Sequence, residues 1–335
     1  MAAYDVVTCG EPMVLFSAGT AGPLRYVGVF RKYAAGAELN FSIGLARLGL
    51  RPGYITRVGD DEFGHYILAC MRVENLDTSL VKVDPERPTG VYFKEYRGLG
   101  DPQVYYYRRG SAASALSRAD IDPTCLEGAR LVHLTGITPV LSPSCWEAAW
   151  YLVELAGQKG VPVSFDPNVR LKLVPRDRVR DDLLPFVTRS KLLLLNEFEL
   201  EVLFGTRDLS AVADQIFDMG PEIVVLKMGV RGAVGMMVND RRLVEVEAFR
   251  PARFLDPVGA GDGFDAGFVF GYLNGWPLEA CLRLGNYVGA SATAVLGDYE
   301  GYPYYADLER AGLINGALRK LPEGMTVTSR GNRGE

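Results

Sequence analysis

Short apolar runs and amphipathic segments alternate along most of the chain. Strand-length apolar runs occupy residues 4–8, 52–58, 130–134, 161–165, 191–195 and 223–227. Segments with helical character occupy residues 36–48, 144–159 and 197–204, another helix starts at 60–64, and helices dominate from 261 to about 296. Strands that alternate with helices are typical of a parallel sheet with helices on both faces. We therefore expect an α/β fold with a doubly wound, mostly parallel sheet.

Two regions depart from this alternation. Residues 89–96 and 103–109 are rich in strand-forming and aromatic side chains, and a turn segment joins them, so they predict a hairpin. Residues 232–249 predict a second hairpin. We expect parts of residues 11–35 and 87–113 to form a small β-sheet, a β lid outside the main core. The α/β unit is expected to span residues 1–320, and the polar residues 321–335 are expected to form a flexible tail.

Composition argues against nucleic acids and membranes as partners. The net charge of the 335 residues is −5, so neither a nucleic-acid surface nor an anionic-membrane surface is expected. The most apolar stretch, residues 266–276, is short and interrupted by glycine, and it does not predict a membrane span. The five cysteines are far apart and form no CxxC pair, which favours a reducing compartment, here the cytoplasm.

Polar side chains gather where the predicted strands end. Asp166, Asn168 and Arg170 follow the strand 161–165. Asn196 and Glu199 follow the strand 191–195, and Lys227 and Gly229 stand at the end of the strand 223–227. In open α/β sheets, ligands bind outside the carboxyl ends of the strands. The sequence therefore predicts the binding site at that edge.

The segment Gly259-Ala260-Gly261-Asp262 precedes a predicted helix. Glycines let successive N–H groups point at one spot, and a helix start adds its positive end, so the segment suits a transferring phosphoryl group. Asp262 could accept the proton of a substrate hydroxyl. A glycine-rich turn with an ordinary first-turn aspartate is an equally good interpretation of this loop alone. GxxxxGK[ST] is absent and no GxGxxG follows the first strand, which disfavours a P-loop ATPase and a Rossmann dehydrogenase.

Two further segments could bind nucleotide. Asn196 and Glu199, three residues apart after a strand, could orient water around Mg²⁺, although an ordinary acidic helix start is the better interpretation without other evidence. The glycines near Lys227, Gly229 and Gly232 could admit a nucleotide close to the backbone. A hairpin turn explains them equally well.

An aromatic and basic strand could bind an acidic sugar. In a strand, Tyr106 and Arg108 share one face. An aromatic ring beside a guanidinium suits a sugar that carries a carboxylate, because arginine binds carboxylate in a fork. Arg170 could supply a second arginine to the same pocket. From spacing alone, the better interpretation is that Arg108 and Arg109 form a solvated face of a hairpin.

Taken together and in this order, the segments resemble the ribokinase/PfkB family of carbohydrate kinases over roughly residues 4–310. Residues 36–40 followed by 59–64 look like the N-terminal signature of that family, and residues 256–268 look like the C-terminal one. Asn196 to Glu199 matches its NxxE pattern. Within the family, residues 106–114 and 166–170 look most like the kinases of 2-keto-3-deoxygluconate. The resemblance implies a sugar-acid kinase that uses ATP and Mg²⁺.

The resemblance also implies roles for single residues. Asp262 would deprotonate the 6-hydroxyl, and Glu199 would act on the metal through water. The expected sugar-acid ligands are Gly36, Asn40, Tyr92, Tyr106, Tyr107, Arg108, Arg170, Asp262 and Asp298. The expected ATP and phosphoryl ligands are Asn168, Val169, Arg170, Asn196, Lys227, Gly229, Arg231, Gly232, Gly259, Ala260, Gly261, Asp262 and Asn286.

Two alternatives remain open. One is a kinase of the same family for a neutral sugar such as fructose or ribose, which would leave the two arginines without a carboxylate. The other is a non-catalytic sugar or nucleotide sensor on the kinase fold. In each case a lid with exposed aromatic strands invites pairing between two chains, so a homo-oligomer through the β lid is expected.

Overall fold

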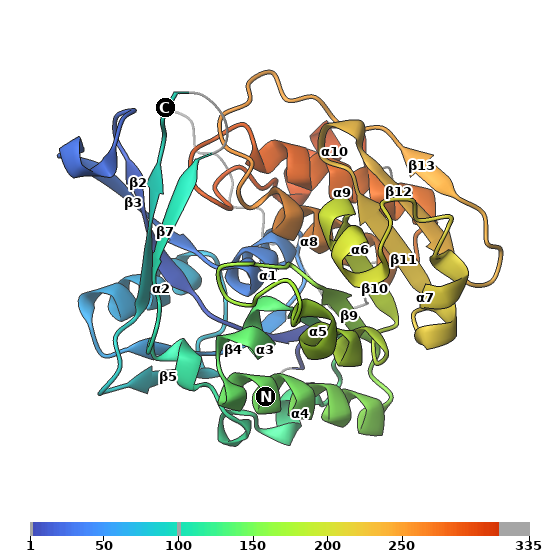
Figure 1. Cartoon of the computed structure of the whole chain (residues 1–335), viewed down its shortest axis with the longest axis horizontal. Coiled ribbons are helices and arrows are strands. Elements are labelled where there is room, and N and C mark those ends of the chain that lie inside the picture. Colours follow the sequence, from blue (N-terminus) through green and yellow to red (C-terminus); the bar gives the residue numbers. More distant parts are fainter. Residues whose placement is uncertain (1–2, 99–101, 315–335) are drawn as a thin grey trace.

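The computed structural model describes residues 3–98 and 102–314 and contains a nine-stranded sheet at its centre (Figure 1). Six neighbouring pairs of strands are parallel, and the two pairs at the end formed by the predicted 232–249 hairpin are antiparallel. In spatial order the strands are β13 (Val244–Val246), β12 (Ala233–Met237), β11 (Ile223–Lys227), β10 (Leu192–Asn196), β9 (Val163–Asp166), β8 (Leu131–Thr135), β1 (Val6–Cys9), β4 (Pro52–Gly59) and β5 (Val81–Asp84).

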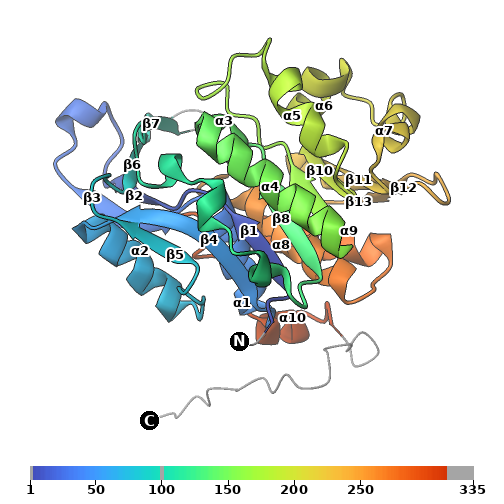
Figure 2. The same ribbon diagram turned by 90° about the horizontal axis from the view of Figure 1, so that it is seen from below.

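Helices cover both faces of this sheet, as Figure 2 shows. The central strands are therefore buried on both faces: in the run 192–195, Leu192 and Leu194 pack into one core, and Leu193 and Leu195 pack into the other. One face carries α3 (Ile137–Leu141), α4 (Pro143–Lys159), α5 (Val179–Val187), α6 (Glu197–Phe204) and α7 (Ala213–Met219). The other carries α1 (Ala37–Arg47), α2 (Glu62–Val73), α8 (Ala260–Leu273), α9 (Leu278–Ala292) and α10 (Tyr305–Arg310).

A separate four-stranded sheet, called the small sheet below, stands beside the main one (Figure 1). Its order is β3 (Phe30–Ala35), β2 (Met13–Ala18), β6 (Gly90–Glu95) and β7 (Gln103–Tyr107). The central pair, β2 and β6, is parallel, and the outer strands pair antiparallel. Met13, Leu15 and Tyr92 form a small core on one face, against which Val104 and Tyr106 pack.

The fold class predicted from the sequence is confirmed, including both hairpins and the small sheet. The sequence pattern missed β5, which has four residues, two of them charged, and it did not mark β2 as a separate strand within residues 11–35. Residues 321–335, predicted to form a flexible tail, lie outside the described residues. Within the described ranges, no helix has both the length and the apolar character needed to cross a membrane.

Candidate active site

A cavity of about 640 Å³ opens between the small sheet and the carboxyl ends of the central strands. It lies where the polar residues after the strands predicted a binding site. The small sheet forms one wall and the segment leading into α8 forms another. Its lining includes Gly36, Asn40, Tyr92, Tyr106, Arg108, Asn168, Arg170, Asn196, Glu199, Lys227, Gly229, Gly232, Gly259, Ala260, Gly261, Asp262, Asn286 and Asp298.

Asp262 lies in the first turn of α8, which begins at Ala260 after Gly259. Gly259 has φ +85°, and a Cβ atom there would lie 1.9 Å from the carbonyl oxygen of Asp298, so the turn into the helix requires glycine. The helix bond from the Gly263 N–H to the Gly259 carbonyl follows this turn. The N–H groups of Gly261 and Asp262 precede it and have no acceptor inside the helix. N–H groups at such a helix start can bind an anion.

Two asparagines hold the Asp262 carboxylate in place. Asn40 donates from Nδ2 to Oδ2 over 2.8 Å, and Asn168 donates from Nδ2 to Oδ1 over 3.4 Å. Burial raises the pKa of Asp262 to about 7, while the Asn40 hydrogen bond and the charge of Arg170 oppose the rise. A carboxyl with this pKa is well matched to a general base that acts near neutral pH.

The other amide atoms of these asparagines point to a polar ligand. Oδ1 of Asn40 and Oδ1 of Asn168 are buried and have no hydrogen-bond partner among the described residues. Buried polar atoms are normally satisfied, and an unpaired acceptor costs about 1–3 kcal/mol. Both atoms belong to residues that line the cavity, so the hydroxyl groups of a bound sugar, or water, could donate to them.

Arg108 lies in the cavity wall but is already paired with a carboxylate. Its Nε and Nη2 donate to Oε2 of Glu11 over 2.6 and 2.5 Å, and Ser111 donates to Oε1 over 2.5 Å. The Glu11 side chain is fully buried. The guanidinium therefore has a fixed orientation, next to the Tyr106 ring whose centroid is 5.4 Å away. Sequence reasoning missed Glu11, which follows the first strand without a motif to mark it.

Arg170 contrasts with Arg108. It is exposed, lines the same cavity, and donates from Nη1 to the carbonyl of its neighbour Val169 over 3.4 Å. No ion pair joins it to any residue in the described ranges. Arg170 thus offers an unneutralised guanidinium to a ligand, whereas the charge of Arg108 is balanced by Glu11.

Lys227 lines the part of the cavity that the sequence predicts to bind nucleotide. Its Nζ donates to Oδ2 of Asp166 over 2.9 Å and to Oδ1 of Asp265 over 3.0 Å. Although burial disfavours the charged form, these two carboxylates raise the pKa of Lys227 above its usual range. The lysine therefore connects the ends of β9 and β11 to α8.

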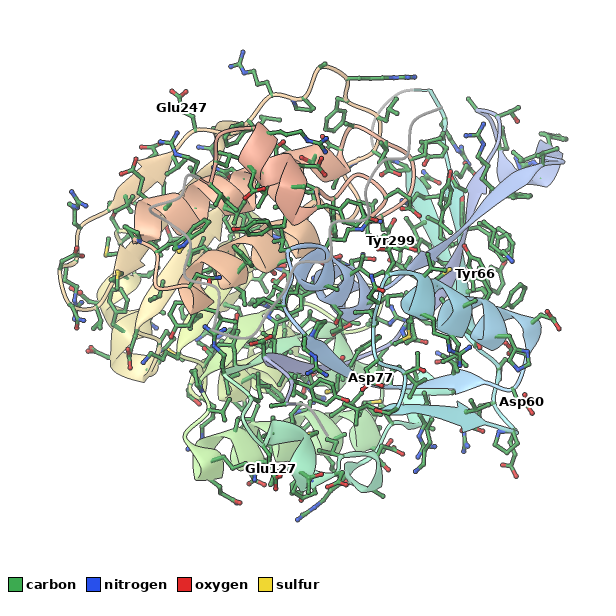
Figure 3. All side chains as sticks on the ribbon, turned by 180° about the vertical axis from the view of Figure 1, so that it is seen from behind. Asp60, Tyr66, Asp77, Glu127, Glu247 and Tyr299 are labelled. Atoms are coloured by element: carbon green, nitrogen blue, oxygen red, sulfur yellow. The ribbon has the colours of Figure 1, made fainter. Side chains whose placement is uncertain are left out.

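Asn286, another residue of the cavity lining, donates to the carbonyls of Val246 and of Glu247. The side chain of Glu247 is exposed (Figure 3).

Glu199 joins two loops of the site. Its Oε2 accepts from the N–H of Asn196 over 2.9 Å, and its Oε1 accepts from the N–H of Val169 over 3.0 Å. Burial, together with the charge of Asp166, raises the pKa of Glu199 to about 7. Both oxygens are engaged, and the described residues contain no group of three acidic, cysteine or histidine side chains placed to hold a metal ion. A hydrated Mg²⁺ held mainly by nucleotide phosphates would therefore contact Glu199 only through water.

Three residues of the predicted set do not line this cavity. Tyr107 is 67% exposed and lies on the opposite face of β7 from Tyr106, because side chains alternate along a strand. Arg231 is an exposed residue paired with Glu197, outside the cavity. Val169 contributes its backbone N–H to Glu199, and its side chain is buried in the core.

Comparison with known proteins agrees with this geometry. A model of the pfkB family of carbohydrate kinases matches residues 4–303. The 2-dehydro-3-deoxygluconokinases of Bacillus subtilis and Thermoproteus tenax are each 36% identical, over 306 and 313 residues, which cover 89% and 90% of this chain and 92% of each relative. The solved structure of a putative ribokinase II from E. coli in complex with ATP and Mg²⁺ has a TM-score of 0.85 and 26% identity, covering 92% of this chain and 98% of that one.

The family match includes both signature segments and the glycine turn before Asp262. The resemblance drawn from residues 36–64, 196–199 and 256–268 is thereby confirmed. Over nine-tenths of its length the chain also shares the fold of an ATP-bound kinase structure. The chain belongs to the pfkB family of carbohydrate kinases and is an ATP-dependent sugar kinase.

Proposed function

We propose that the protein transfers the γ-phosphoryl group of ATP to the 6-hydroxyl of 2-keto-3-deoxygluconate, which is also called 2-dehydro-3-deoxygluconate. The observation that carries this proposal is the joint presence of Asp262, Tyr106, Arg108 and Arg170 around one cavity. Two relatives at 36% identity carry the name of this activity, which supports the same assignment.

Residues of the small sheet and of the loop after β9 bind the sugar acid. The carboxylate of the substrate binds Arg170, which has no ion-pair partner in the described parts of the chain, and the Arg108 guanidinium that Glu11 orients. Gly36, Asn40, Tyr92, Tyr106 and Asp298 contact the rest of the sugar. Charge-assisted, bidentate contacts are among the strongest hydrogen bonds, which gives an acid an advantage over a neutral sugar.

Asp262 acts as the general base in the transfer. Its carboxylate accepts the proton of the 6-hydroxyl as the bond from that oxygen to the γ-phosphorus forms and the bond to the ADP oxygen breaks. The turn of residues 259–261 supplies the anion position: the N–H groups of Gly261 and Asp262 stabilise the charge on the phosphoryl oxygens, whereas the N–H of Ala260 donates to the carbonyl of Pro257 over 3.3 Å. Mg²⁺, when bound, would neutralise charge on the phosphates. Asn196 and Glu199 would contact it through water.

The nucleotide lies along the ends of β10 and β11. Asn168, Lys227, Gly229, Gly232 and Asn286 form this side of the cavity. Glycine at 229 and 232, each with positive φ, lets the backbone approach the nucleotide closely. Arg231, which lies outside the cavity, and the backbone of Val169 contribute less directly.

The small sheet acts as a lid and as a dimer surface in this proposal. A lid over the sugar excludes water, which competes as a phosphoryl acceptor. No strand of the described residues pairs with the outer edge of β3 or of β7, and Tyr105 and Tyr107 are exposed on β7. Edges of this kind favour pairing with a second copy of the chain. Sedimentation that finds a monomer at micromolar concentration would remove the dimer.

The five cysteines are free in the structure, which supports a reducing compartment and a cytoplasmic location. A non-catalytic sensor is disfavoured for two reasons. The chain belongs to a family of kinases, and Asn40 holds the Asp262 carboxylate in place, as a catalytic base requires. A kinase of a neutral sugar remains the competing assignment.

An ADP-release assay with purified protein tests the proposal. The panel contains 2-keto-3-deoxygluconate, its epimer, fructose and ribose, each with ATP and Mg²⁺. The sugar acids should give the highest kcat/KM, and mass spectrometry should place the phosphate on the 6-hydroxyl. A preference for fructose or ribose would assign the protein to the neutral-sugar kinases instead.

A further inference from the structure

A fully buried lysine joins the small sheet to the segment around the glycine turn. Lys94 of β6 has no exposed side-chain surface, and neither motif nor spacing marked it in the sequence. Its Nζ donates to Oδ2 of Asp256 over 2.8 Å and to Oδ1 of Asp298 over 3.0 Å. The two carboxylates are themselves buried. A buried ammonium is expensive to desolvate and persists only with partners of this kind.

Two tyrosines on the same strand face strengthen the connection. Tyr92 donates its hydroxyl to Oδ2 of Asp298 over 2.8 Å, and Tyr96 donates to Oδ2 of Asp256 over 3.0 Å. Residues 92 and 94 alternate in β6, and residue 96 follows directly after its end, so the three side chains leave the small sheet on one side. One face of the small sheet thus makes four hydrogen bonds to the two aspartates.

Both aspartates are attached to the glycine turn. Oδ1 of Asp256 accepts from the N–H of Val258 over 3.0 Å, which fixes the entry to the turn. The backbone carbonyl of Asp298 packs directly against Gly259, where no Cβ atom would fit. Any shift of these two residues therefore moves the N–H groups that precede Asp262.

The charges of this cluster also affect the anion position. Two carboxylates beside a phosphate-binding turn repel phosphate, and buried charges are poorly screened. One ammonium between them removes much of that repulsion. Lys94 thus supplies both a mechanical link and a compensating charge, on the strand that also carries Tyr92 toward the sugar.

We propose that Lys94 is a positioning residue for phosphoryl transfer, which couples the small sheet to the glycine turn through Asp256 and Asp298. Closing of the small sheet on the sugar and alignment of the turn for the phosphoryl group then occur together. This inference rests on the proposed role of the turn and of Asp262.

The test compares Lys94→Ala with the wild-type protein in the ADP-release assay. Because a misplacement of about 1 Å costs on the order of 10²-fold in rate, kcat should fall about 10²-fold. The KM for ATP should change little, because the turn contacts the transferring group rather than the adenosine. The KM for the sugar should rise as well, because Asp298, the partner of Lys94, is one of the proposed sugar contacts. Lys82→Ala is the matched control: Lys82 also pairs with a nearly buried carboxylate, Asp120, but lies on β5 away from the cavity.

Chemical rescue separates a specific charge from general packing. Propylammonium replaces the three methylenes and the ammonium lost in Lys94→Ala, and 1-propanol has the same shape without the charge. Propylammonium should restore kcat several-fold, and propanol should not. Equal rescue by both, no rescue of a folded Lys94→Ala, or a wild-type kcat in that variant would overturn the inference.

A second variant decides the question if Lys94→Ala does not fold. Tyr96→Phe removes one hydroxyl bond to Asp256 and keeps the ring. Its kcat should fall several-fold with an unchanged melting temperature, and an unchanged kcat would overturn the inference. Absence of wild-type turnover on every sugar would refute the proposed function, and the inference with it. Wild-type turnover matched by these variants would refute only the role of Lys94.

Discussion

Arg170 provides a direct test of how the protein recognises an acidic sugar. The side chain is exposed in the cavity, and it makes no ion pair within the part of the chain that the structure describes. Arg170→Met removes its charge and its donors and keeps much of the aliphatic length. No buried partner is left behind, so the fold should be unaffected. Arg108 is less suitable, because its removal leaves Glu11 buried without a counter-charge.

The size of the effect follows from the contact that is lost. A hydrogen bond to a charged group contributes about 1.5–3 kcal/mol. Since about 1.4 kcal/mol corresponds to a factor of ten, kcat/KM for the sugar acid should fall about 10- to 150-fold. The carboxamide of the same sugar carries no charge, so Arg170→Met should change its kcat/KM much less.

The assay therefore uses two proteins and two substrates, which form a thermodynamic cycle. ADP release is measured for wild type and Arg170→Met with 2-keto-3-deoxygluconate and with its carboxamide. Arg176→Met is the control, because Arg176 is a nearby exposed arginine that pairs with Glu201 outside the cavity. Equal losses on both substrates, or no loss on the acid, would refute recognition of the carboxylate by Arg170.

Three further predictions follow from the same site. Asp262→Asn should lower kcat by about 10²–10⁴-fold while calorimetry still detects ATP binding, and undiminished turnover would exclude its role as the base. Because Asp262 must be ionised to accept a proton and burial raises its pKa to about 7, kcat/KM should rise with pH, reach half its maximum near pH 7 and level off about one unit higher. A profile that is flat from pH 5 to 8 would contradict this. Arg108→Ala should reduce the free energy of unfolding by about 3–5 kcal/mol, since it leaves the buried Glu11 carboxylate unpaired, and an unchanged urea midpoint would contradict that reasoning.

Local patterns predicted much of the molecule. Alternating apolar and amphipathic segments predicted the parallel sheet and its two helical layers, because burial on one or two faces imposes a period on the sequence. The predicted helix start at 259–262 is observed, with Gly259 in a left-handed conformation before α8. The capping pair of Asn196 and Glu199 is also local, three residues apart, and the structure closes it with two hydrogen bonds.

Several contacts of the site join residues that are far apart in the sequence, and no local sequence pattern predicts such contacts. Asn40 and Asp262 are 222 positions apart, and Glu11 and Arg108 are 97 positions apart. Spacing placed Arg108 in a strand, but it could not reveal that a buried carboxylate already occupies two of its nitrogens. Tyr106 and Tyr107 are neighbours in the sequence and were both expected to bind the sugar. In the strand their rings point to opposite faces, and only Tyr106 lines the cavity.

The sequence by itself determined the class of fold, the edge of the sheet where polar residues collect, and the residue types suited to phosphoryl transfer. Only the tertiary structure decided which arginine is free, which amides hold Asp262, and that Lys94 joins the small sheet to the glycine turn. The physical reason is that secondary structure depends on short-range periodicity. The pairing of buried charges depends instead on which distant segments the packed core brings within about 3 Å of one another.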